Sequence, residues 1–177
     1  MTLNYPIRKS RVQQKESSNS QAFADLRDVP ETGRIIALDP GTKRIGVAVS
    51  DPDRVLASPL PIVERTSWKK LLTQIRDTLA EFDAKVLVVG LPYNFDGTES
   101  EMTAEARNMA RKFELSLDVP VYLQDERATT YEARGRLWKA GLEGKGMQRV
   151  LDSEAATIIL TDFLDRLKNA PGNLSRC

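Results

Sequence analysis

The chain has 177 residues, of which 41% are hydrophobic, and its net charge is +1. It is therefore about the size of one domain, can form an ordinary core, and has no overall charge that would favour a nucleic-acid partner. It contains no histidine, and its single cysteine is Cys177, which excludes histidine-dependent triads, histidine-bound zinc and a disulfide framework. No apolar run reaches the roughly 20 residues of a membrane span, and no signal peptide is recognisable. We expect a cytoplasmic protein without a membrane partner.

Residues 1–33 are basic at their start and rich in Ser and Gln. This composition predicts a flexible N-terminal extension, which is either an arm that contacts nucleic acid or, as the composition favours, a solvated tail without a role. The apolar pattern begins at Arg34 and predicts one folded domain over residues 34–168. Residues 169–177 are expected to form a C-terminal tail.

Three strands are predicted first. Residues 34–38 (RIIAL) and 45–50 (IGVAVS) are apolar runs joined by a Pro-Gly turn. Residues 55–63 (VLASPLPIV) predict an edge strand, because proline is tolerated mainly at sheet edges. The three segments are close in the sequence, so we expect an antiparallel meander. Thr66 or Ser67 can then cap a helix whose apolar face is made of Trp68, Leu71, Leu72, Ile75 and Leu79.

The rest of the chain alternates between strands and helices. Residues 85–91 (KVLVVGL) predict a buried parallel strand, and residues 91–100 predict a loop. A second helix is expected to start with a capping box formed by Thr98 and Glu101. Its apolar face is made of Met102, Ala106, Met109 and Phe113.

A short strand is expected at residues 119–124, followed by a third helix that Thr129 and Glu132 cap and Gly141 ends. Residues 141–150 (GLEGKGMQRV) predict a loop, and a last helix is expected from near Asp152. The order of elements predicts a three-layer α/β domain. Its mixed five-stranded sheet has three antiparallel strands followed by two parallel ones, and helices flank it.

Acidic residues recur where the carboxyl ends of these strands would meet. Asp39 ends the first strand, and Asp125 and Glu126 end the last one. Asp152 shares a helix face with the apolar residues that follow it at positions 156, 159 and 163. Carboxylates that gather at one place repel one another unless a cation compensates. Without His or Cys ligands, Mg²⁺ or Mn²⁺ is the expected cation, and such ions can support phosphodiester hydrolysis.

Each acid also has a simpler interpretation. Asp39 before Pro-Gly can be a turn residue, and so can Asp96 in Asn-Phe-Asp-Gly. Asp152 can act only as a helix N-cap, and Glu126 can form an ordinary surface pair with Arg127. The metal-site interpretation depends on all the acids occurring in the right topological order.

Polar and basic residues near these acids are candidates for substrate binding. They lie in the first hairpin turn, in the loop after the central strand, at the predicted start of the third helix, and in the loop before Asp152, where hydroxyls, amides and cations suit phosphate. Solvated surface is the alternative for each cation. The candidates are Gly41, Lys43, Arg44, Asn94, Asp96, Arg127, Thr129, Thr130, Lys145 and Arg149.

Four segments, ALDPGTKRIGVAVSD, VVGLPYNFDG, QDERATT and LDSEAATIIL, together resemble the signature segments of the YqgF family. Its members are described as pre-16S rRNA nucleases and as Holliday junction resolvases. The resemblance covers about residues 34–168 and implies an RNase H-like fold. It also implies a metal-dependent nuclease in which Asp39, Glu126 and Asp152 are the catalytic metal ligands. The lysine-rich run that family members often carry before the last acid is reduced here to Lys145 and Arg149.

The resemblance implies, as the leading function, maturation of the 5′ end of pre-16S rRNA, with ribosomal precursor particles as partners and a monomer or homodimer as the active form. Branched DNA is the second substrate class, for a Holliday junction resolvase. A non-catalytic nucleic-acid-binding or transcription-associated factor on the same fold is a further alternative. An actin-like kinase or ATPase has a similar phosphate-binding hairpin, but it closes two such domains over its nucleotide, and this chain predicts one.

Overall fold

A computed structural model describes residues 26–94, 96–126 and 145–170, except for the side chains of Arg27 and of residues 145–152. Within these ranges the chain forms a five-stranded sheet with the strand order β3-β2-β1-β4-β5. The strands are β1 (Arg34–Pro40), β2 (Arg44–Ser50), β3 (Ala57–Glu64), β4 (Ala84–Leu91) and β5 (Val121–Asp125). The helices are the short 3-10 helix η2 (Leu26–Asp28), α1 (Trp68–Glu81), α2 (Glu101–Ser116) and α4 (Lys145–Lys168).

The strand directions confirm the predicted mixed sheet. β1 pairs with β2 and β2 with β3 in antiparallel fashion, whereas β1 pairs with β4 and β4 with β5 in parallel. The proline-containing strand β3 lies at one edge, as its sequence predicts. The parallel pairs place the carboxyl ends of β1, β4 and β5 at one end of the sheet.

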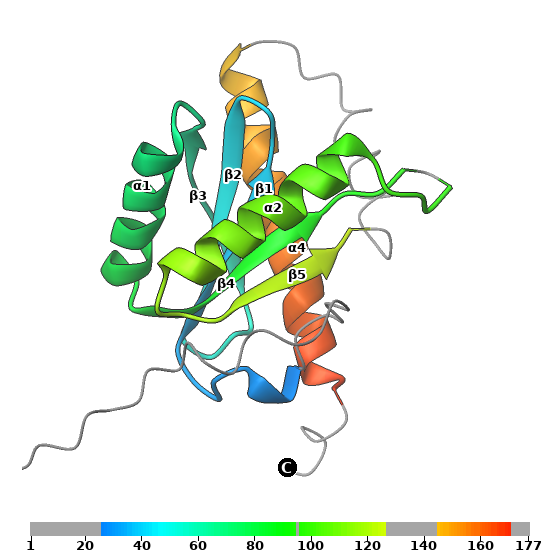
Figure 1. Cartoon of the computed structure of the whole chain (residues 1–177). Coiled ribbons are helices and arrows are strands. Elements are labelled where there is room, and N and C mark those ends of the chain that lie inside the picture. The colour runs from blue at the N-terminus through cyan, green and yellow to red at the C-terminus, as the bar shows by residue number, and fades with distance from the viewer. Residues whose placement is uncertain (1–25, 95, 127–144, 171–177) are drawn as a thin grey trace, which may run out of the picture.

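The molecule has three layers, because α1 and α2 cover one face of the sheet and α4 covers the other (Figure 1). Alternate residues of each strand enter different cores. In β1, Ile36 and Leu38 pack with α1 and α2, whereas Ile35 and Ala37 pack with α4. The predicted apolar face of the last helix is confirmed, since Ala156, Ile159, Phe163 and Leu167 are all buried. None of the described helices is long and apolar enough to cross a membrane.

The start of α1 confirms one predicted cap, and the start of α2 corrects another. The Ser67 side chain accepts a hydrogen bond from the Lys70 N–H and is the N-cap of α1. The capping box of α2 pairs Ser100 with Thr103, so the predicted pair of Thr98 and Glu101 is wrong. The Thr98 hydroxyl instead donates to Asp96 Oδ1 over 2.6 Å, which holds Thr98 in the preceding turn.

The last helix begins earlier than its sequence predicts. α4 starts at Lys145, not near Asp152, so the predicted loop over residues 141–150 is wrong from residue 145 onward. A single glycine within a helix lowers the stability of the helix by only about 1 kcal/mol. The packing of α4 on the sheet offsets this cost at Gly146. Asp152 therefore lies inside the helix and is not its N-cap. The predicted third helix, from Thr129 to Gly141, falls outside the described residues.

Residues 26–33 pack against the domain, although the sequence places them in the flexible extension. Val29 is buried in the core under α4. The buried Arg54 donates hydrogen bonds to the carbonyl oxygens of Pro30, Thr32 and Gly33 over 2.6, 2.9 and 2.7 Å. Burial lowers the pKa of Arg54, but a guanidinium stays charged at neutral pH, so these carbonyls replace the water that a cation needs.

We expect Arg54→Met to lower the free energy of unfolding by about 1–3 kcal/mol, because it removes three hydrogen bonds from a buried guanidinium to the carbonyl groups of residues 26–33. Urea denaturation of the full chain measures this loss. Asp53→Ala is the matched control, since Asp53 is the exposed neighbour in the same turn. If the two variants unfold at the same urea concentration, Arg54 does not hold residues 26–33 on the domain.

Candidate active site

Asp39 lies in β1 at the end of the sheet where the parallel strands terminate. Side chains alternate along a strand, so Asp39 shares the α4 side of the sheet with Ile35 and Ala37. It is half-buried. In the parallel pair, Leu38 is opposite Val89 of β4, and the residue after Val89 is Gly90. The register thus places Asp39 beside a position that has no side chain.

The turn after Asp39 requires glycine. The Gly41 N–H donates to the Asp39 carbonyl over 3.0 Å, and a Cβ atom on Gly41 would lie 2.3 Å from the Arg44 carbonyl oxygen. The Arg65 side chain donates to the Gly41 carbonyl over 3.3 Å. Lys43 is exposed at the tip of the turn, and Arg44 is half-buried at the start of β2. The turn therefore fixes the backbone of Asp39 and exposes one of the predicted phosphate-binding cations.

Glu126 follows β5 at the same end of the sheet, where its N–H donates to the Leu91 carbonyl over 3.3 Å. Its Oε1 atom is buried, with less than 1 Å² exposed. A Cβ atom on Gly90 would lie 2.5 Å from this oxygen and 2.5 Å from Cδ1 of Ile159 in α4. Because Gly90 has no side chain, the Glu126 carboxylate can occupy the space between the sheet and α4.

Asp152 lies within α4 one helical turn before Ala156, and its side chain is outside the described part of the structure. Neighbouring residues fix this part of the helix. The Ser153 hydroxyl is buried and donates to the Leu60 carbonyl of β3 over 2.7 Å. Ala156 and Ile159 pack on the same face of the sheet that carries Asp39 and Glu126. The backbone position of Asp152 thus agrees with the predicted third acid, whose side-chain position stays a prediction.

The loop after β4 is held by its own side chains and by α2. Asp96 Oδ1 accepts hydrogen bonds from the N–H and hydroxyl of Thr98, which lower the pKa of Asp96. Asn94 donates from Nδ2 to the Thr98 hydroxyl oxygen over 2.9 Å. Both side chains are exposed. The contacts of Asp96 thus agree with its interpretation as a turn residue. The role of Asn94 and Asp96 in binding a substrate stays a prediction.

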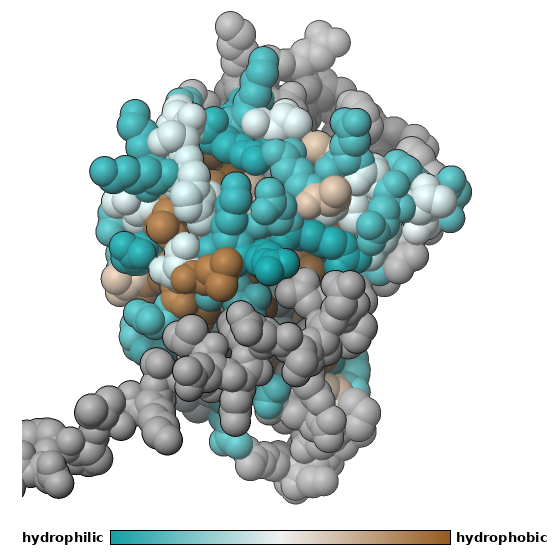
Figure 2. All heavy atoms as spheres, viewed as in Figure 1, coloured by the Kyte–Doolittle hydropathy of each residue, from teal (hydrophilic) through white to brown (hydrophobic). Residues whose placement is uncertain are grey.

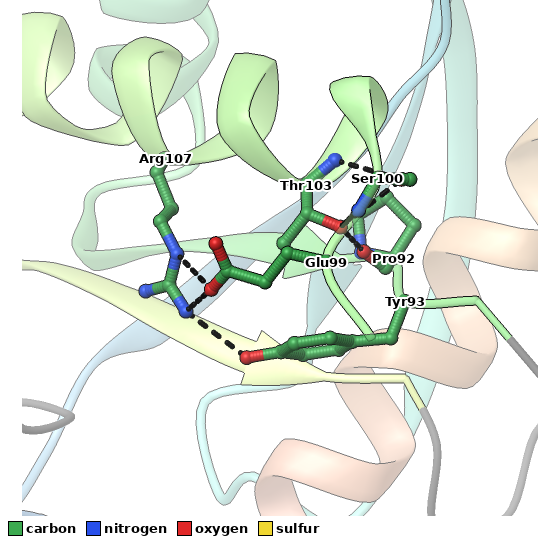
Figure 3. Close-up of polar contacts among 6 residues, drawn as sticks. All are labelled: Pro92, Tyr93, Glu99, Ser100, Thr103 and Arg107. Atoms are coloured by element: carbon green, nitrogen blue, oxygen red, sulfur yellow. Dashed lines mark hydrogen bonds and ion pairs between the residues drawn. The ribbon is translucent and has the colours of Figure 1, made fainter. Parts of the chain in front are cut away.

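Arg107 of α2 ties the two ends of this loop together (Figure 3). Its Nη2 atom lies 2.8 Å from Glu99 Oε1 and 3.0 Å from the Tyr93 hydroxyl, to which it donates. The Thr103 hydroxyl donates to the Pro92 carbonyl. The loop thus starts at Leu91, whose carbonyl accepts the Glu126 N–H, and its side chains are held by α2.

A family model described as "RuvX: Holliday junction resolvase" matches residues 33–166 of this chain. The chain belongs to the RuvX family. Curated relatives named "Putative pre-16S rRNA nuclease" include one from Clostridium beijerinckii, 40% identical over 76% of this chain and 97% of the relative. Another, from Maridesulfovibrio salexigens, is 36% identical over 75% of this chain and 98% of the relative. A solved structure of Thermus thermophilus RuvC with a Holliday junction substrate gives a TM-score of 0.48 at 14% identity, over 80% of this chain and 97% of that chain.

The described residues of this RuvX-family chain fit a divalent cation that prefers oxygen. Asp39 in β1 and Glu126 at the end of β5 supply carboxylate oxygens from the two parallel strands on either side of β4, and such oxygens are the ligands that hard divalent cations prefer. No three acidic side chains gather within the described residues, and Asp152, the expected third ligand, is outside that set. The donor chemistry thus agrees with Mg²⁺ or Mn²⁺ held by these acids.

Five of the predicted substrate-binding residues have side chains outside the described part of the RuvX-family chain. Arg127, Thr129 and Thr130 follow Glu126 directly, while Lys145 and Arg149 have described backbones only and belong to α4. The expectation that these two lie in a loop is wrong. Their place on the first turns of the helix that contains Asp152 still keeps them near that acid in the sequence.

Gly90 and Ser153 support the acids and were not predicted from the sequence. A glycine inside an apolar strand is a signal for close approach of another group, and Gly90 in Val-Val-Gly-Leu carries that signal. The approaching group, Glu126, is 36 residues away, so the sequence alone does not name it. Ser153 has no comparable signal, because a serine beside Asp152 is equally typical of a solvated helix surface.

Proposed function

We propose that this protein is a metal-dependent endonuclease that hydrolyses phosphodiester bonds and matures the 5′ end of pre-16S rRNA. The observation that carries the proposal is the position of Asp39 and Glu126 at the carboxyl ends of β1 and β5, on either side of β4, with Gly90 giving room for the Glu126 carboxylate. Membership of the RuvX family and the names of the curated relatives support a nucleic-acid substrate.

Asp39, Glu126 and Asp152 are the residues that would hold two Mg²⁺ or Mn²⁺ ions. Bound there, such ions supply a hydroxide nucleophile and stabilise the leaving 3′ oxygen. The protein itself fixes the carboxylates, because the Gly41 turn holds the Asp39 backbone and α4 closes over the Glu126 side chain. Burial on the α4 side restricts access of bulk water to Oε1 of Glu126.

The remaining candidates would bind and orient the substrate. Lys43 is exposed in the turn beside Asp39, and Arg44 follows it. Phosphate contacts of this type position a strand without reading its bases. Asn94 and Asp96 would contact the substrate strand from the anchored loop after β4. A further group of residues would contact the strand around Glu126 and Asp152: Arg127, Thr129, Thr130, Lys145 and Arg149.

Resolution of branched DNA is the second candidate function, and the description of the matching family model favours it. Both reactions hydrolyse a phosphodiester bond and need the same acids. We propose a cytoplasmic site of action and precursor ribosomal particles as partners for the first function, as the names of the relatives suggest.

A cleavage assay separates these functions. The substrates are a labelled RNA that spans the 5′ end of the 16S rRNA precursor and a four-way DNA junction, each with Mg²⁺, with Mn²⁺ and with chelator. We expect metal-dependent cutting of the RNA. Cutting of the junction alone assigns the protein to recombination. Binding of either substrate without cutting under all metal conditions contradicts the nuclease and favours a non-catalytic binding factor.

A further inference from the structure

A concave site lies on the other face of the sheet from the carboxylates. It is a pocket of about 450 Å³ between the tip of the β1–β2 hairpin, the start of α1 and the middle of α2. Thr42, Arg65, Ser67, Trp68, Asn108 and Lys112 are among its lining residues. Hydrophilic residues dominate this area of the surface (Figure 2). The volume is in the range of small-molecule sites, and its lining is polar with an apolar floor of Leu71 and Met109.

The two cations of the pocket are held in place. Arg65 forms an ion pair with Glu105 and donates to the Gly41 carbonyl. The Lys112 ammonium lies 5.6 Å from the centre of the Trp68 ring, a cation–π distance, and Trp68 in turn packs on Phe113 with ring centres 4.8 Å apart. Glu105 balances the charge of Arg65, so Lys112 supplies the net positive charge among the lining residues. This arrangement is suited to an anion.

The first turn of α1 adds further positive potential. The turn contains Lys69 and Lys70 and no acidic residue. Cations near a helix N-terminus oppose the helix dipole and destabilise the helix. The lysines therefore do not serve the stability of α1, whereas an anion bound in the pocket would gain from both the dipole and the lysines.

The pocket and the carboxylate site share one structural element. Arg65 lines the pocket and binds the Gly41 carbonyl, while the Gly41 N–H binds the Asp39 carbonyl. The hairpin turn, with Lys43 exposed at its tip, thus separates the two sites. A nucleic-acid strand that crosses this turn reaches both faces.

We propose that this pocket binds a phosphate-bearing nucleotide unit of the substrate strand, away from the cleaved bond. The choice of a nucleic-acid strand as the source of this phosphate rests on the proposed function. A free mononucleotide offers the same chemistry, with its phosphate at Lys112 and the start of α1. Because the aromatic face of Trp68 is engaged by Lys112 and Phe113, the pocket recognises phosphate and not base identity.

The test uses the full chain with Asp39→Asn, so that a bound strand is not cut. A labelled single-stranded RNA is titrated at several salt concentrations, with and without Lys112→Ala. We expect Lys112→Ala to weaken binding about three- to tenfold and to reduce the slope of log affinity against log salt by about 0.7, the value for one lost phosphate contact on a single strand. Arg111→Ala is the matched control, because Arg111 is an exposed cation of the same helix that does not line the pocket.

A second arm identifies the source of the phosphate. Inorganic phosphate and AMP are added separately, and the backbone amide signals of residues 66–70 are followed by NMR. If Lys112→Ala abolishes the amide signal changes but leaves RNA binding unaffected, the pocket binds a free nucleotide. Equal RNA affinity and salt slope for Lys112→Ala and Arg111→Ala, with no amide changes, overturn the proposal. Metal-dependent cleavage by the wild-type chain is scored separately, so failure of the pocket is distinguishable from failure of the nuclease.

Discussion

Asp39→Asn is expected to reduce the rate of metal-dependent cleavage by about a thousandfold or more, the scale of loss when a central member of a catalytic group is removed. Asn has the shape of Asp but lacks the charge that a divalent cation requires from its ligand. The turn that fixes Asp39 uses its backbone carbonyl and the Gly41 N–H, so the substitution leaves that turn intact. Single-turnover cleavage of the RNA precursor measures the loss.

The same variant separates a catalytic Asp39 from a turn residue through its stability. Asp39 and Glu126 place negative charge at one end of the sheet, and Asp39→Asn removes part of that repulsion. In metal-free buffer we expect a free energy of unfolding equal to or slightly above the wild-type value. Asp118→Asn, at an exposed position, controls for the chemical change itself. A melting temperature well below that of the wild type would show that Asp39 is a structural turn residue.

The sheet was predictable because each strand carries its own signal. Val86 to Val89 form an uninterrupted apolar run, and this strand is buried on both faces between two parallel neighbours. The prolines of β3 indicate an edge, and the short connection between β1 and β2 permits only an antiparallel pair. These signals are local, so they do not depend on knowledge of the partner strands.

Helix starts were less predictable, because several residues compete for the same donors. Thr98 and Ser100 can both act as N-caps in the sequence, and the choice depends on Asp96, which engages Thr98 in a turn. The start of α4 depends on tertiary contact, since Gly146 predicts a loop until the sheet face that the helix covers is known. The pattern of Ala156, Ile159 and Phe163 predicted the buried face of this helix correctly but not its first residue.

The places of Asp39 and Glu126 in the sheet were predictable, whereas the contacts that support them were not. Asp39 and Glu126 follow apolar strands, so their position at the carboxyl end of the sheet is a consequence of strand order. β4 lies between the two acids, and the Glu126 carboxylate approaches it at Gly90. This approach depends on the register of three strands and on Ile159 from α4. Such a contact joins residues distant in the sequence, and no local pattern specifies it.

Gly90→Ala is expected to damage both the site and the packing of α4. The added Cβ atom would meet Glu126 Oε1 and Ile159 Cδ1, each at 2.5 Å, which is too close for either atom to remain in place. Overpacking of this kind costs about 1–3 kcal/mol of stability. Displacement of a catalytic carboxylate by about 1 Å lowers the rate by about a hundredfold. Urea denaturation and single-turnover cleavage measure the two effects.

The double variant Gly90→Ala with Ile159→Val separates these effects, because valine lacks the Cδ1 atom that the new methyl group would meet. We expect stability to recover to about that of Ile159→Val alone, the matched control, which itself costs about 0.5–1.5 kcal/mol. We expect the cleavage rate to stay low, since the Cβ atom of residue 90 still lies against the Glu126 carboxylate. Recovery of the rate together with stability would mean that Gly90 acts through the position of α4. A rate that stays low in a restored fold identifies the space at Gly90 as part of the active site.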